Sequence, residues 1–98
     1  MLDQLQASDF EPFLNQTMNM RFSPEIVLPA EMVEVREVRG ESPLARKPFT
    51  VVMRTNQTTH YYNQTMCVLE HPEKGDLTLF FVPVGFDGKG VLYEAAFS

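Results

Sequence analysis

The sequence predicts a mainly β fold, a small six-stranded antiparallel barrel or sandwich with one short N-terminal helix. Apolar residues alternate with a period of two in several runs, which is the spacing of side chains on one face of a strand. Stretches rich in Pro, Gly and Asp separate these runs and favour turns. A length of 98 residues suits one domain, residues 1–98.

The final third of the chain carries the clearest strand pattern. Its middle run, residues 77–82, has apolar side chains on both faces: Leu77, Leu79 and Phe81 on one, Thr78, Phe80 and Val82 on the other. Two apolar faces are typical of a covered central strand or of the wall of a closed barrel. Turn-forming residues fill 70–76 and 83–90. We therefore expect antiparallel strands over 65–69, 77–82 and 91–97.

A helix and a first strand are expected near the N-terminus. Ser8 and Glu11 have the Ser-x-x-Glu spacing of a capping box, in which each side chain bonds a free backbone N–H of the first turn. Pro12 is tolerated only in that first turn, so the predicted helix is short, over residues 8–15. Strict alternation over residues 17–22 then predicts a half-buried strand.

The next apolar region, residues 26–38, is interrupted by Pro29. Because proline cannot donate to a strand ladder, we expect a connecting segment followed by a strand over about 32–38. Val38 is out of phase with Val33 and Val35, and a bulge near Arg36–Glu37 would restore the alternation. A further strand is expected over residues 49–54.

Composition and charge narrow the classes of function. The net charge of -5 is spread along the chain, which disfavours non-specific nucleic-acid binding. No window approaches the roughly eighteen apolar residues of a membrane span, and the N-terminus lacks the order of a signal peptide. A single cysteine, Cys67, fits a reducing compartment. We therefore expect a cytoplasmic protein on synthesis, with no membrane or nucleic-acid partner.

No residue pattern indicates a catalytic, cofactor or metal site. Cys67 lies in the middle of a predicted strand, without the base and positive field that activate a thiol, and is interpreted as inert packing. His60 and His71 do not have the spacing of metal ligands. The sequence therefore predicts a protein that is not an enzyme and needs neither a cofactor nor a metal.

Contact residues are predicted in two loops. Residues 55–64 are polar apart from His60, Tyr61 and Tyr62, and exposed aromatic residues are typical of contact surfaces. The alternative is that one tyrosine folds back as a lid on the barrel end. Phe86 and Asp87 in the last turn are the other candidates, and we expect the two loops at the same end of the domain.

The chain resembles a bacterial and phage family of domains of unknown function, about a hundred residues long. The resemblance is carried by Asp9–Pro12, Pro48–Phe49, Val68–Glu73, Leu79–Gly85, Asp87–Gly88 and Tyr93–Phe97. Family members are found near genes for phage-tail collars or tail-fibre-like proteins, so the resemblance implies a tail-associated or virion role and brings no catalytic residues. The chain departs from the family pattern at Cys67, where an aromatic residue is usual, and in the His60–Tyr62 loop.

Three functions remain open at this point. The first is a non-enzymatic protein–protein interaction or structural module, self-associating or part of a phage-tail-like particle. The second is a small acidic inhibitor or regulator that binds a basic groove on a host protein, suggested by the net charge of -5. The third, an unrecognised enzyme, would require a paired acid and base.

Overall fold

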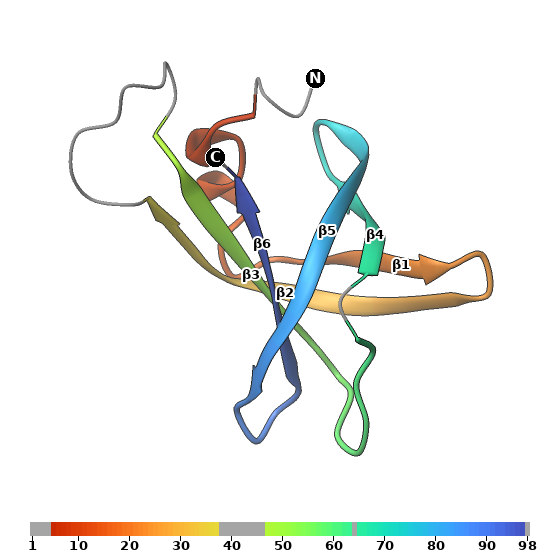
Figure 1. Cartoon of the computed structure of the whole chain (residues 1–98). Coiled ribbons are helices and arrows are strands. Elements are labelled where there is room, and N and C mark those ends of the chain that lie inside the picture. The colour runs from red at the N-terminus through yellow and green to blue at the C-terminus, as the bar shows by residue number, and fades with distance from the viewer. Residues whose placement is uncertain (1–4, 38–46, 64, 98) are drawn as a thin grey trace.

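The computed structural model describes residues 5–37, 47–63 and 65–97. Within them, six antiparallel strands form a closed barrel in the order β1-β2-β3-β6-β5-β4 (Figure 1). The strands are β1 (Thr17–Ser23), β2 (Ile26–Glu37), β3 (Phe49–Thr55), β4 (Thr65–His71), β5 (Gly75–Phe86) and β6 (Val91–Phe97). The predicted mainly β fold is confirmed. Because the sheet is closed, the fold is the barrel and not the sandwich.

The inward faces of the strands fill the barrel. Residues 77–82 contribute as the alternation predicts, since Leu77, Leu79 and Phe81 are buried. On the outer face, Phe80 remains 48% exposed and is paired across the strands with Met66 of β4. Burial of each large apolar side chain contributes about 1.5–3 kcal/mol. Among the described residues, these buried side chains form one hydrophobic core.

Pro29 does not split β2, contrary to the prediction of a strand over about 32–38. The strand begins at Ile26, and Pro29 pairs with Asn19 of β1. Pairing with β3 starts only at Ala30, so at Pro29 the strand has a neighbour on one side. A residue that lacks an N–H is tolerated on such an edge. Val38 lies outside the described residues.

A bulge is present in β2, but not near Arg36–Glu37, where it was predicted. The register between β2 and β3 shifts between Met32 and Glu34. Met32 is fully buried, and Val35 packs against the core. These two residues are three apart because Val33 is the extra residue. The predicted position of the bulge is therefore wrong.

The strand predicted over 77–82 extends further, from Gly75 to Phe86. Pro83 was expected in a reversal, yet it pairs with Tyr93 of β6. Pairing between β4 and β5 stops at Thr65 and Phe81, so Pro83, like Pro29, lies where the strand has a partner on one side. The reversal is confined to the turn that follows Phe86.

The N-terminal helix is one short helical segment, residues 7–13, made of two consecutive 3-10 turns, Ala7–Asp9 and Glu11–Phe13. The capping box predicted at Ser8 and Glu11 is wrong. The N-cap is Gln6, whose N–H donates to Asp9 Oδ2 at 2.8 Å. Pro12 stands in the first turn of the second piece, as its missing N–H requires.

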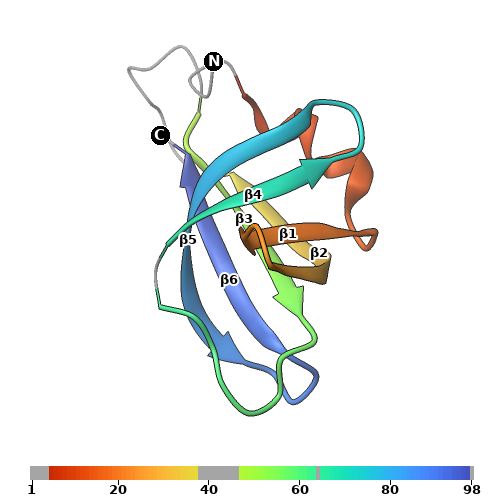
Figure 2. The same cartoon turned by 90° about the vertical axis from the view of Figure 1, so that its right-hand side faces the viewer.

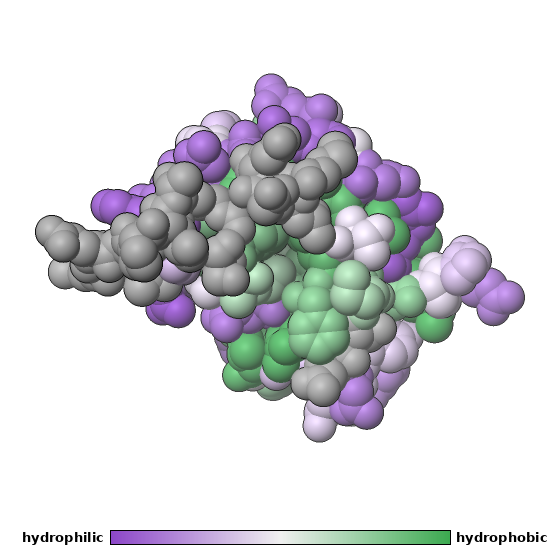
Figure 3. Space-filling view, turned by 45° about the horizontal axis from the view of Figure 1, so that its top comes forward, coloured by the Kyte–Doolittle hydropathy of each residue, from purple (hydrophilic) through white to green (hydrophobic). Residues whose placement is uncertain are grey.

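This helical segment closes one end of the barrel, seen at the top of Figure 1. The ring of Phe10 is fully buried, with its centroid 5.8 Å from that of Phe49 and 5.5 Å from that of Phe97. Phe49 and Phe97 stack on each other at 4.5 Å. Figure 3 views this end and shows apolar side chains near its middle, with hydrophilic residues around them.

Candidate functional site

The two loops predicted to carry contact residues lie at the same end of the barrel. The connection after β3 and the turn between β5 and β6 are side by side at the bottom of Figures 1 and 2. This end is opposite the helical segment. The arrangement follows from the topology, because β3 and β6 are antiparallel neighbours, so the end of β3 meets the start of β6.

Tyr61 and Phe86 flank a hollow at this end. It has a volume of about 260 Å³ and is lined by Tyr61, Pro83, Gly85, Phe86 and Val91. The two aromatic side chains are 60% and 55% exposed. None of the lining residues carries a formal charge. We call this feature the Tyr61–Phe86 hollow.

Tyr62, by contrast, folds back onto the barrel. Its ring centroid lies 4.9 Å from that of Phe22, and its backbone N–H donates to the hydroxyl of Tyr93 at 3.0 Å. The Tyr93 hydroxyl in turn donates to Oε1 of the buried Gln57 at 2.7 Å. Tyr62 therefore folds back as the lid that one alternative predicted, whereas Tyr61 is exposed and its role as a contact residue stays a prediction.

His60 and Asp87 take different roles from Tyr61. His60 is exposed, and its ring meets that of Tyr62 edge-on at 6.1 Å. The carboxylate of Asp87 accepts the backbone N–H groups of Lys89 at 2.9 Å and Gly90 at 3.1 Å. The pKa of Asp87 is lowered below its usual value, and the hydrogen bond from the Lys89 backbone is the largest cause. Asp87 thus forms the turn that positions Phe86.

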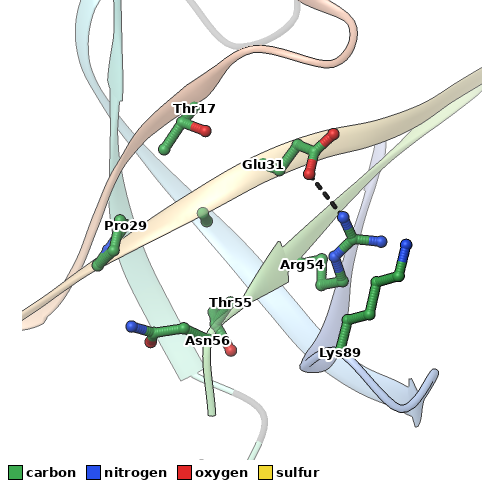
Figure 4. Close-up of a pocket in the computed structure, with 8 residues that line it drawn as sticks. Thr17, Pro29, Glu31, Arg54, Thr55, Asn56 and Lys89 are labelled. Atoms are coloured by element: carbon green, nitrogen blue, oxygen red, sulfur yellow. Dashed lines mark hydrogen bonds and ion pairs between the residues drawn. The ribbon is translucent and has the colours of Figure 1, made fainter.

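A second hollow lies beside this turn, between β2, β3 and the β5–β6 connection (Figure 4). Arg54 reaches into it and bonds Glu31 at 2.6 Å and Asp87 at 3.0 Å. The pKa of Arg54 is raised above its ordinary value, and the hydrogen bond to Asp87 is the largest cause. With two carboxylates on one guanidinium, this arrangement connects three elements and leaves no net positive charge for an anionic ligand.

Cys67 is buried in the core. Burial raises the pKa of its thiol to about 12, so the thiolate that nucleophilic chemistry requires is scarce at neutral pH. The described residues contain no group of three or more His, Cys, Asp or Glu side chains placed to hold a metal ion.

His71 has a role that sequence reasoning missed. It is only 3% exposed, and its Nε2 lies 2.7 Å from the backbone carbonyl oxygen of Asp9. The ring centroid is also 4.8 Å from that of Phe13. His71 thus joins the β4–β5 hairpin to the N-terminal helical segment. Only its place in a turn was visible in the sequence, since nothing local relates residues 9 and 71.

The architecture and the Tyr61–Phe86 hollow together define a small closed antiparallel β-barrel with an exposed aromatic end. No helix in the described ranges is long and apolar enough to cross a membrane. The chain belongs to the family described as Domain of unknown function (DUF6916), whose model matches residues 5–97. A search of curated proteins found no match, and neither did a search of solved structures.

Proposed function

We propose that this protein is a non-enzymatic protein-binding module, a structural or assembly component of a larger particle of the phage-tail kind. The observation that carries the proposal is the pairing of Tyr61 and Phe86 across one uncharged hollow. Large, mostly exposed aromatic side chains that meet at a hollow are typical of residues that dominate binding energy. Tyrosine and phenylalanine bury a large area at little cost in side-chain entropy.

The surrounding structure supports a pre-formed surface. Asp87 accepts two backbone N–H groups of the turn and an ion pair from Arg54, which restrains the segment beside Phe86. Tyr62 is anchored by Tyr93, which restrains the residue beside Tyr61. A surface whose neighbours are already fixed loses less entropy on binding. The resemblance to domains encoded near tail genes supports the choice of a particle component.

The experiment is a size measurement by sedimentation, for the chain alone over a range of concentrations and with the products of its neighbouring genes. We expect the wild type to self-associate or to enter a larger complex. The double variant Tyr61→Ser with Phe86→Ser should weaken that association about tenfold or more, as loss of binding anchors does. Its thermal melting should stay close to that of the wild type, because both side chains are mostly exposed.

Phe80→Ser is the control, because Phe80 is also half-exposed but is not among the residues that line the hollow. It should leave the association unchanged. Association that survives the double variant, or a wild type that stays monomeric with every neighbouring product, would reject the proposal. A monomer that binds a host protein with strong salt dependence would instead favour the acidic inhibitor, since charge-driven association weakens as salt rises.

A further inference from the structure

His71 is a buried titratable group that bonds Asp9 of the helical segment, and that segment lies at the end of the barrel opposite the β5–β6 turn. Its Nδ1 accepts the backbone N–H groups of Glu73 at 3.0 Å and Lys74 at 2.9 Å. Because both of those partners are donors, Nδ1 carries no proton. The ring proton is therefore on Nε2, which donates to the Asp9 carbonyl at 2.7 Å. The hydrogen bonds thus require the neutral ring in one tautomer.

Aromatic rings and two charged side chains surround the imidazole. Phe10 and Phe13 meet the imidazole edge-on, with centroids at 5.4 Å and 4.8 Å. The Asp9 carboxylate attracts a charged ring, and it pairs with the Lys74 ammonium, which repels one, at 3.4 Å. The Glu73 carboxylate belongs to the same turn and is exposed to solvent.

We propose that His71 is a pH-sensitive latch that holds the N-terminal segment, residues 5–14, on the barrel at neutral pH and releases it in acid. A proton taken from solvent at Nδ1 turns an acceptor into a donor that faces two backbone donors. Both hydrogen bonds are then lost, and a charged ring remains among aromatic side chains, which is unfavourable. The charged ring is more stable in water, so it moves out of the core.

Movement of the ring removes three of the contacts that hold the segment. The Asp9 carbonyl loses its donor, and Phe10 and Phe13 lose the ring against which they pack. Release of Phe10 uncovers the stacked rings of Phe49 and Phe97 at the barrel end. The barrel strands keep their pairing, since none of their ladder bonds involves the imidazole. This latch is separate from the proposed binding role of the other end.

The test is hydrogen exchange of the full chain, corrected for the intrinsic effect of pH on exchange, between about pH 7.5 and pH 5, the range in which histidine ordinarily titrates. Backbone amides of the helical segment should lose protection about tenfold or more in acid, as the loss of two buried hydrogen bonds implies. Amides of β3 and β6 should keep their protection over the same range.

Two variants separate the two histidines of the chain. H71N offers an amide oxygen near the position of Nδ1 but does not titrate, so the pH dependence should disappear. H60N removes the exposed histidine and should leave the pH dependence intact. Because H60N leaves His71 as the remaining histidine, its result decides the question even where H71N folds poorly. Unchanged protection in H60N across this pH range, or an undiminished pH dependence in folded H71N, would overturn the latch.

Discussion

The hydroxyl of Tyr93 accepts the backbone N–H of Tyr62 at 3.0 Å. This bond joins the middle of β6 to the connection between β3 and β4, 31 positions apart in the chain. The same hydroxyl donates to Gln57, so one side chain holds two points of one loop. Burial raises the Tyr93 pKa, which keeps the donor proton in place under ordinary conditions.

Tyr93→Phe should therefore destabilise the domain by about 1–3 kcal/mol, because it leaves the buried Gln57 carbonyl oxygen and the Tyr62 N–H without this partner. The free energy of unfolding is measured by urea denaturation. Tyr61→Phe is the matched control: its side chain is mostly exposed, and the change should fall within about 0.5 kcal/mol. Equal stabilities of the two variants would contradict the anchoring role of the Tyr93 hydroxyl.

Gly90 is required because the backbone of β3 approaches it closely. A Cβ at this position would lie 1.7 Å from the carbonyl oxygen of Thr55. Gly90→Ala should cost about 2 kcal/mol or more, since the backbone must shift, and should lower the melting temperature by roughly 8 °C or more. Gly85→Ala, where nothing lies within 4 Å of the added Cβ, should have little effect. Similar melting temperatures for the two variants would show that the backbone of Thr55 can move away from residue 90 at little cost.

Cys67 should resist thiol reagents while the protein is folded. Its pKa of about 12 and its burial leave only about one thiol in ten thousand ionised at pH 8. Labelling should proceed only as fast as the chain unfolds, and should become rapid in denaturant. The control moves the thiol by one position, in Cys67→Ala with Met66→Cys, because Met66 is 53% exposed. Rapid labelling of the folded wild type would mean that Cys67 is accessible.

Asp9 should make stability depend on acid pH. The hydrogen bond from Gln6 lowers the pKa of its carboxyl below the ordinary 3.8, and Lys74 adds to this. A carboxyl group whose pKa is lower in the folded state stabilises the fold at pH values above its unfolded-state pKa. That stabilisation is lost as the pH falls through its folded-state pKa. Asp9→Asn should therefore be less stable at pH 7, by about 1 kcal/mol or less for this partly exposed group.

The difference between Asp9→Asn and the wild type should shrink as the pH falls below 3.8. Urea denaturation at a series of pH values measures it. Glu11→Gln removes an exposed carboxylate from the next turn and serves as the control, with little change expected at any pH. A stability difference that stays constant down to strongly acid pH would mean that the carboxylate charge has no part in the effect.

Much of the barrel could be predicted from local patterns. The inward residues of β5 follow from alternation alone, because a strand places every second side chain on one face. The two prolines within strands could not be placed, because their tolerance depends on which sheet edge lacks a neighbour. The position of the β2 bulge likewise depends on the register with β3, which no short window contains.

The candidate site was predicted in part. Aromatic composition identified the loop that carries Tyr61 and Tyr62, but not which tyrosine faces solvent, because that is decided by Phe22 and Tyr93 from distant strands. The role of His71 was missed for a related reason. Its partners Asp9 and Phe13 come from the N-terminal segment, and a single sequence does not reveal contacts between segments so far apart.

The seam between β1 and β4 is the shortest in the barrel. Its register consists of two residue pairs, Met20 with Leu69 and Arg21 with Val68. Arg21 adds ion pairs across it, to Glu70 at 3.0 Å and to Asp76, and such exposed pairs are weakened by salt. Screening by salt should therefore weaken the closure of the barrel at this seam by no more than about 1 kcal/mol, as for other exposed ion pairs, while the fully buried Met20 and Leu69 keep the two strands together.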